Sequence, residues 1–431
     1  MYQTTVTDIN EFLVRDAVRE AGEVTRRDLS ERLGLSAASV SRIVRRLVEA
    51  GVVSQESSAS TGPGRSSDII RFNHRSGAVI AVDLGGTKCH GVLADLGAET
   101  LAEDFRATRA DGTAAETLMA TIAALREAAR AAAIDVRAVV VGVPAVPDPD
   151  TGLVGSGPNV DWEDYDLIGL MRERVEEPFR VENDVTLAAI GQAWRGEGQA
   201  ASGFVTLSIG TGIGAAAFAN GQVLRGRHNA AGEIATMVMT GDQLRATPGT
   251  VAGLETVASG PAIARRAVEL LAAGRHSQLE ADGLTAQQVF VAAAAGDAVA
   301  RTVIEELLDY VAMAVINLAA VLDPERIILD GSVGRALEPY ADAIMERVGW
   351  RLPNVPSLRF SRLGPNATVI GAIAGALALD RELDARRTVA EIPRDGWRAL
   401  ASLPSYGDHG DTEDGTAASA AAADGDQLDV P

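Results

Sequence analysis

The sequence predicts an α/β protein of two lobes with a small, mainly helical head at its N-terminus. Residues 7–50 carry apolar side chains at helical spacing, in stretches that end at glycine. From Ala78 onward, short apolar runs alternate with longer helical stretches, which is the pattern of α/β architecture. Two segments, 79–95 and 204–219, share one layout: an apolar strand, a glycine-rich turn and a second apolar strand.

Composition and length bound the class of protein. The chain has 431 residues, of which 47% are hydrophobic, so we expect two to four domains with substantial cores. No run of 18 uncharged apolar residues and no signal peptide are found, so we expect a cytoplasmic protein without a membrane partner. The single cysteine, Cys89, excludes an internal disulfide and a multi-cysteine metal site.

The charge is distributed unevenly along the chain. Residues 1–75 carry 11 arginines against 10 acidic residues, a net charge of +1, whereas the whole chain carries −20, which leaves −21 on the remainder. An acidic body repels a phosphate backbone, so the head is the part we expect to contact DNA.

The head has the pattern of a winged helix-turn-helix. A helix over 7–21 is followed by a short helix capped by Thr25, a turn at Gly34, and a third helix over 37–50 capped by Ser36. Strands at 52–55 and 68–72 flank a loop, 57–66, that forms the wing. A plain three-helix bundle with a solvated basic face is the alternative. The residues expected to contact DNA are Ser36, Ala37, Ala38, Ser41, Arg42, Arg45, Arg46 and, in the wing, Arg65.

The body carries a candidate nucleotide site. A glycine turn alone is equally consistent with a simple β-hairpin, but two such loops facing each other would hold phosphates through their backbone amides. Between them, a strand over 179–184 ends at Asp184, a candidate general base. A third glycine turn at Gly331 is placed for an adenosine. The expected nucleotide-binding residues are Asp83, Gly85, Gly86, Thr87, Lys88, Gly210, Thr211, Gly212, Gly214 and Gly331.

Five motifs, which follow one another along the chain in the order typical of the family, resemble the ROK family (repressors, open reading frames and sugar kinases). The resemblance is to its branch with an N-terminal winged helix. Residues 83–88 and 210–214 resemble the two phosphate loops, 182–184 the segment with the sugar-contacting Asn and catalytic Asp, 231–234 the sugar loop, and 35–42 the start of the recognition helix. The resemblance covers roughly 8–380. It implies that Asn183, Asp184, Glu233 and Glu255 bind a sugar.

The resemblance also implies a fold and its domains. We expect a winged helix-turn-helix (1–75) followed by an actin-like, ribonuclease-H-like ATPase fold. That fold comprises an N-terminal lobe (76–195) and a C-terminal lobe with a helical subdomain (196–380). An acidic tail (381–431) is poor in large apolar residues, so we expect it to be disordered.

One departure from the family concerns zinc. In the family, Gly-Glu-Ile is followed by Gly-His, whose His binds the sugar and a structural zinc, and three cysteines follow. Here these positions are Ala235 and Thr236, and residues 246–253 contain no cysteine. Thiolates and imidazole are the ligands such a site requires, so we expect no zinc and no other metal site.

Three functional hypotheses follow. The first is a transcriptional repressor of carbohydrate uptake and metabolism genes that needs no cofactor. It binds double-stranded operator DNA as a homodimer or dimer of dimers, and a sugar or sugar derivative in the cleft changes the spacing of its heads. The alternative is a bifunctional, ATP- and Mg²⁺-dependent kinase that phosphorylates a hexose with Asp184 as general base. The third is that the nucleotide cleft is only a structural relic.

Overall fold

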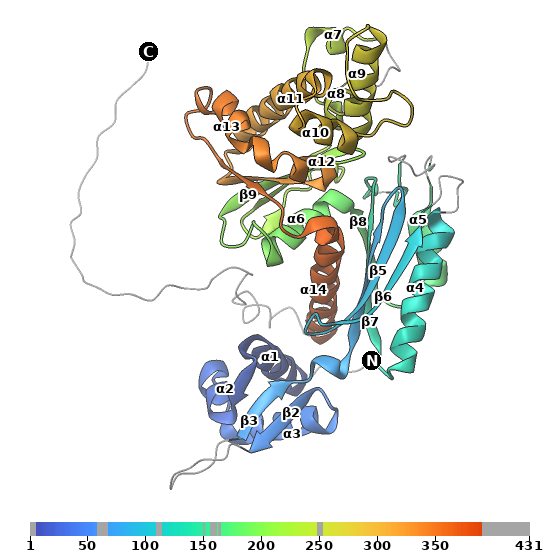
Figure 1. Ribbon diagram of the computed structural model, residues 1–431. Helices are drawn as coiled ribbons and strands as arrows, with labels where there is room; N and C mark the ends of the chain where they lie inside the picture. Colours follow the sequence, from blue (N-terminus) through green and yellow to red (C-terminus); the bar gives the residue numbers. More distant parts are fainter. Residues whose placement is uncertain are drawn as a thin grey trace, which may run out of the picture.

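The computed structural model describes residues 6–57, 68–108, 114–149, 151–155, 162, 165–247 and 253–389. The head lies at one end of the molecule, and the two lobes follow (Figure 1). Within the described residues, no helix combines the length and hydrophobicity needed to cross a membrane.

The head is a winged helix-turn-helix, as predicted. Its elements are α1 (Val6–Ala21), β1 (Glu23–Thr25), α2 (Arg26–Leu33), α3 (Ala37–Glu49), β2 (Val53–Ser57) and β3 (Asp68–Phe72), with strand order β1-β3-β2. The Thr25 and Ser36 hydroxyls cap α2 and α3, and Gly34 ends α2 in the left-handed conformation at φ 64°. The sequence did not predict β1, because a three-residue strand has no periodicity of its own. The wing with Arg65 lies outside the described residues.

The N-terminal lobe has a five-stranded sheet. Its strands are β4 (Ala78–Leu84), β5 (Lys88–Asp95), β6 (Thr100–Ala107), β7 (Val136–Val143) and β8 (Phe179–Asn183), in the order β6-β5-β4-β7-β8. The helices α4 (Ala114–Ala131) and α5 (Leu167–Arg174) share one apolar cluster with one face of this sheet. The first three strands are antiparallel, and β4, β7 and β8 run parallel, which brings their carboxyl ends to one edge.

The C-terminal lobe repeats this topology. Its strands are β9 (Gly203–Ile209), β10 (Ile213–Ala219), β11 (Gln222–Val223), β12 (Arg326–Asp330) and β13 (Ser357–Phe360), in the order β11-β10-β9-β12-β13. In both lobes the order is therefore third, second, first, fourth and fifth strand. The helices are α7 (Gly241–Leu244), α8 (Glu255–Ala258), α9 (Gly260–Ala272), α10 (Ala286–Ala294), α11 (Ala298–Leu322), α12 (Gly331–Ala336) and α13 (Ala341–Gly349). Two lobes with one repeated topology confirm the actin-like fold.

The helices α6 (Asp184–Arg195) and α14 (Ala367–Val389) pack against each other, and the far end of α14 lies beside α1 of the head (Figure 1). They pack backbone to backbone: a Cβ on Gly371 would lie 1.7 Å from the Leu187 carbonyl oxygen, and one on Gly191 would lie 2.5 Å from the Ala367 carbonyl oxygen. Such contacts leave no room for sliding, so α6 and α14 form one rigid pair.

The course of α14 differs from the predicted domain limits. The helix packs against the sheet of the N-terminal lobe, with Val369 and Ile373 in the same apolar cluster as Val79. It also continues to Val389, so the boundary expected at residue 380 falls inside it. The acidic residues that suggested a tail from 381 onward instead form ion pairs with other parts of the molecule up to Asp384. The rest of the predicted tail, from residue 390, lies outside the described residues.

Candidate functional site

The first glycine turn lies at the end of β4 and presents a carboxylate to the cleft. The Gly85 amide donates to the Lys88 carbonyl at 2.8 Å, closing the turn between β4 and β5. Asp83, just before the turn, is 8% exposed. Burial raises the pKa of Asp83 to about 6, and the nearby Lys88 ammonium opposes this shift. Thr87 and Lys88 are exposed and Gly86 is half-buried.

Asn183 and Asp184 stand where β8 passes into α6. The Asn183 side-chain oxygen caps the helix, because it accepts hydrogen bonds from the amides of Val185 at 2.9 Å and Thr186 at 3.1 Å. Its amide nitrogen remains directed at the Ala145 carbonyl, 3.5 Å away. Burial raises the pKa of Asp184 to about 7, and the carboxylates of Asp83 and Glu233 add to the effect. A carboxyl group with this pKa suits a general base at neutral pH.

The second and third glycine turns lie against each other in the C-terminal lobe. The Gly210 amide donates to the Gly212 carbonyl at 2.9 Å, and the Gly210 carbonyl accepts from the Gly260 amide at 2.8 Å. Gly331 has a φ of 77°, and a Cβ there would lie 2.3 Å from the Ile209 carbonyl oxygen. Only glycine fits this close approach. Thr211 is exposed, whereas Gly214 is half-buried.

A small cavity of about 100 Å³ lies between Asp184 and the third turn. A water occupies about 30 Å³, so the cavity holds about three waters or a group the size of a phosphate. Asp330 is 3% exposed and accepts from Arg335 at 3.1 Å. The sequence prediction missed the lining residues Ser208, Asp330, Arg335 and Thr368. Asp330 directly precedes the third glycine turn, so its place at the site could have been predicted from the sequence. Arg335 and Thr368 reach the cavity only through the tertiary fold.

Two more carboxylates approach from the C-terminal lobe. The Glu255 carboxylate accepts from the Ile213 amide at 2.9 Å, which ties α8 to the second glycine turn. Burial raises the pKa of Glu233, and the charge of Glu255 raises it further. The charges of Asp83 and Glu233 both act on Asp184, so the structure brings these three carboxylates near one another, with Glu255 close to Glu233. Carboxylate oxygens accept directional hydrogen bonds, so the arrangement suits a polyhydroxylated ligand.

Contacts across the cleft mouth join the two lobes. Arg225, which follows β11, forms an ion pair with Glu182 on β8. Asn229 donates to the Pro147 carbonyl at 3.3 Å. A ligand that changes the angle between the lobes must therefore act on these two contacts. The sequence prediction did not single out Arg225 or Asn229.

The family's zinc does not fit this chain. Ala235 and Thr236 supply neither a thiolate nor an imidazole. Within the described residues there is no group of three or more His, Cys, Asp or Glu side chains that could hold a metal ion.

The candidate DNA-binding face lies on α3. Ser36, Ala37, Ala38, Arg42 and Arg45 are exposed, and Ser41 is half-buried. Arg46 differs, because its guanidinium forms an ion pair with Glu11 on α1. The structure therefore leaves the first six residues accessible on α3 and turns Arg46 toward Glu11 on α1.

The fold and the cleft define a protein built on a two-lobed kinase scaffold that carries a winged-helix domain. The ROK family model matches residues 79–379, and the chain belongs to this family. The MarR family model matches residues 6–62.

The relatives include both enzymes and repressors. A glucokinase of Halalkalibacterium halodurans is 36% identical over 248 residues, covering 55% of this chain and 75% of that protein. A xylose repressor of Caldicellulosiruptor bescii is 24% identical, covering 86% of this chain and 96% of that protein. Among solved structures, a ROK family transcriptional regulator described as a homolog of E. coli MLC has a TM-score of 0.73 and 25% identity, covering 89% and 99% of the two chains.

Proposed function

We propose that the protein is a sugar-responsive, DNA-binding transcriptional repressor of carbohydrate genes, with a sugar or sugar derivative bound in the cleft between the lobes. The observation that carries the proposal is the course of α14. This helix starts beside the candidate sugar site and ends in contact with the DNA-binding head. The repressors among the relatives, which align over the head as well as the body, support the same proposal.

At its first end, α14 contacts the site directly. Thr368 donates to the backbone carbonyl of Asp184 at 3.3 Å, and both residues line the cavity. The helix has 23 residues and is therefore about 34 Å long. Since α14 and α6 are locked together, a shift of Asp184 on ligand binding moves the whole helix pair.

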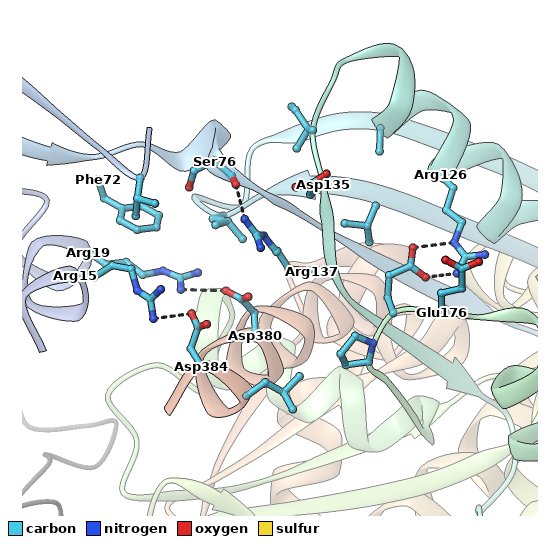
Figure 2. A pocket seen from close by; sticks show the side chains of 18 of the residues that line it. Arg15, Arg19, Phe72, Ser76, Arg126, Asp135, Arg137, Glu176, Asp380 and Asp384 are labelled. Atoms are coloured by element: carbon cyan, nitrogen blue, oxygen red, sulfur yellow. Dashed lines mark hydrogen bonds and ion pairs between the residues drawn. The ribbon is translucent and has the colours of Figure 1, made fainter. Parts of the chain in front are cut away.

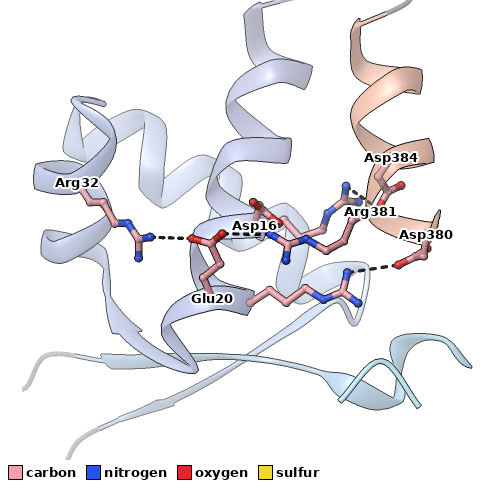
Figure 3. Close-up of polar contacts among 8 residues, drawn as sticks. Asp16, Glu20, Arg32, Asp380, Arg381 and Asp384 are labelled. Atoms are coloured by element: carbon pink, nitrogen blue, oxygen red, sulfur yellow. Dashed lines mark hydrogen bonds and ion pairs between the residues drawn. The ribbon is translucent and has the colours of Figure 1, made fainter. Parts of the chain in front are cut away.

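At its other end, α14 contacts α1 through a set of charged residues that we call the junction network (Figure 3). It consists of Arg15, Asp16, Arg19, Glu20, Asp380, Arg381 and Asp384. Arg19 pairs with Asp380 at 3.3 Å and Arg15 with Asp384 at 2.9 Å, while Arg381 pairs with Asp16 at 2.8 Å and Glu20 at 3.1 Å. These pairs require one relative position of the two helices.

Beside the junction network, a hollow of about 500 Å³ lies between part of the head and part of the N-terminal lobe (Figure 2). Arg19 and Phe72 of the head face Asp135 and Arg137 of the body across it. The head is thus held firmly at α14 and has space on the β7 side. This combination allows the head to change its orientation when α14 moves.

A ligand shifts the equilibrium between two head orientations only if it binds the protein more tightly in one orientation than in the other. In a homodimer or a dimer of dimers, a changed head orientation alters the distance between two recognition helices and hence the fit to paired half-sites. We propose a dimer on this ground of symmetry.

A binding assay tests the function. Operator affinity is measured by gel shift on DNA from the gene's own promoter region, with and without a panel of sugars and phosphosugars. We expect specific binding that at least one sugar changes by about fivefold or more, the lower range of allosteric coupling. Specific operator binding that no sugar alters would refute the sugar response, and the lack of specific binding would refute the DNA-binding role.

A second candidate function is an ATP-dependent sugar kinase, and the environment of Asp184 favours it. The group has a pKa suited to a base, lies between the glycine turns, and belongs to a chain 36% identical to a glucokinase. ADP release is measured across a sugar panel for the wild type and Asp184→Asn. Turnover that disappears in the variant supports kinase activity, and its absence in the wild type excludes it for those sugars.

Nucleotide binding without turnover is tested separately. Lys88 is the only lysine of the chain, so amine acetylation outside the N-terminus reports on this residue alone. If ATP·Mg²⁺ occupies the first glycine turn, it slows the acetylation of Lys88 as followed by mass spectrometry. Equal rates with and without nucleotide would favour the relic hypothesis.

A further inference from the structure

Two neighbouring segments of the C-terminal lobe carry the candidate sugar carboxylates. Glu233 immediately precedes a short 3-10 helix, Ile234–Thr236, and Glu255 begins α8. The chain between them lacks the zinc ligands of the family, and a different interaction, a side-chain hydrogen bond, joins the two segments. The side chain of Gln243, the third residue of α7, supplies it.

The Gln243 side-chain amide forms three hydrogen bonds, two with the residues just before α7 and one across the base of this loop. Its oxygen accepts from the backbone amides of Met239 at 2.6 Å and Thr240 at 3.2 Å. Its nitrogen donates to the Gly253 carbonyl at 3.0 Å. The side-chain oxygen of Gln243 thus bonds to the segment that follows Glu233, and its nitrogen bonds to the segment that precedes Glu255.

The segments meet so closely that their register matters. Gly253 has a φ of 157°, and a Cβ there would lie 2.5 Å from the Ala235 carbonyl oxygen. The Leu254 amide donates to the Met237 carbonyl at 2.9 Å. Glu255, one residue later, accepts from the Ile213 amide of the second glycine turn. Gln243 is therefore linked through Gly253 to Glu255, and through Glu255 to the second glycine turn.

We propose that Gln243 is a positioning residue for the sugar site, and that its hydrogen bonds hold Glu233 and Glu255 in place where the family uses a metal. The sugar site itself is that of the proposed function. Mutation of the outer-shell partners that orient metal ligands costs about 10- to 100-fold in metal affinity, and we expect Gln243→Ala to lose sugar affinity in the same range.

Gln288 provides a matched control. Both glutamines are the third residue of a helix whose N-cap is threonine, and both complete a capping box, with Thr240 and with Thr285. Only Gln243 also reaches a second segment. Gln243→Ala and Gln288→Ala therefore lose the same helix cap, but only the first loses the cross-loop contact.

The first measurement is hydrogen exchange without sugar. In Gln243→Ala we expect faster exchange of the Leu254 and Ile213 amides, neither of which is bonded to Gln243. In Gln288→Ala we expect no change at these amides, with a similar small fall in Tm for both variants. Wild-type exchange rates at Leu254 and Ile213 in Gln243→Ala would overturn the proposal, whether or not any sugar binds.

The second measurement is the affinity for D-glucose or D-xylose by calorimetry, after dialysis against EDTA. We expect a loss of at least about tenfold in Gln243→Ala, wild-type affinity in Gln288→Ala, and an intermediate value in Gln243→Glu, which keeps the acceptor but not the donor. Loss of wild-type binding on EDTA treatment that zinc restores would overturn the proposal. If neither sugar binds the wild type, neither is the ligand of the proposed function, and the exchange result alone decides the role of Gln243.

Discussion

Arg19 and Asp380 form an ion pair between α1 and α14, although 361 positions separate them in the sequence. Their side chains are only 13% and 11% exposed, at an N–O distance of 3.3 Å. The Arg19 guanidinium also lies 5.2 Å from the centre of the Phe72 ring. Burial lowers the pKa of Arg19, and the carboxylate of Asp380 acts against that shift. The contact therefore joins the DNA-binding head to the helix that begins at the sugar cleft.

The first prediction concerns the strength of this contact. Asp380→Asn removes the ion-pair partner of Arg19, whose charge is largely buried, and breaking a buried pair costs about 3 kcal/mol or more. We expect the free energy of unfolding, measured in urea, to fall by about 3 kcal/mol. Glu382→Gln is the control: Glu382 pairs with Arg180 of the body, and both side chains are more than a third exposed. Its expected effect is below about 1 kcal/mol. Equal effects in the two variants would contradict a buried junction.

The second prediction concerns the transmission of the sugar signal. Asp384→Asn removes the Arg15 pair, whose partners are 28% and 27% exposed, and so weakens the junction network at lower cost to stability. We expect the sugar-dependent change in operator Kd to shrink toward unity while the affinity for sugar stays within about twofold, because coupling energy and binding energy are separable. Glu382→Gln again serves as control. An unchanged sugar response in Asp384→Asn would show that the signal takes another route.

The third prediction concerns pH. The folded protein raises the pKa of Asp184 to about 7 from an ordinary value of about 4, so the native state binds a proton that the unfolded chain releases. The resulting stabilisation is complete below pH 4 and is lost as the pH rises to 7. Asp184→Asn lacks this titration, so the Tm of the variant relative to that of the wild type should increase as the pH rises from 4 to 8. A constant Tm difference over this range would contradict the raised pKa.

The same titration predicts a rate profile for the kinase hypothesis. A general base acts only when deprotonated, so turnover should increase with pH up to about 7 and then level off. Asp83, with a pKa raised to about 6, is coupled to Asp184, so the profile reports the pair. Turnover that falls over this range would assign the base to another group.

The fourth prediction concerns DNA contacts on α3. Arg42 and Arg45 are exposed residues in the middle of α3, the candidate recognition helix. Replacing either with alanine should weaken operator binding by about 1–3 kcal/mol if the side chain contacts a base, or reduce the salt dependence if it contacts phosphate. Arg46→Ala, which breaks the pair with Glu11, is expected to lower the Tm of the head more than the operator affinity. If all three variants lose operator affinity equally, Arg46 contacts DNA, as the sequence predicts.

Local patterns made much of the architecture predictable. The caps at Thr25 and Ser36 are signals within four residues of the amides they bind, and the structure confirms both. The glycine turns at Gly85 and Gly210 stand between apolar strands, so their place at strand ends followed from spacing alone. Asp83 and Asp184 were predictable as neighbours because Asp83 is the penultimate residue of β4 and Asp184 directly follows β8, and the carboxyl ends of these parallel strands meet at the same sheet edge.

Other features arise from contacts between distant segments. The extension of α14 to Val389 depends on arginines of α1 that pair with its acidic side chains; without those partners, the same residues have the composition of a tail. Gln243 looks like any capping glutamine, and only Gly253 opposite its amide distinguishes it from Gln288. Arg46 has the spacing of a DNA contact, but Glu11 on another helix determines its direction.

The sequence by itself determined the winged head, the repeated strand-turn-strand units, the carboxylates of the cleft and the absence of zinc ligands, because each depends on residue type and short-range spacing. Only the tertiary structure decided that α14 links the cleft to the head, that Gln243 bridges the sugar loop, and that Asp184 has a pKa near 7. The physical reason is that burial and ion pairing are properties of neighbours in space, and these neighbours lie far apart in the chain.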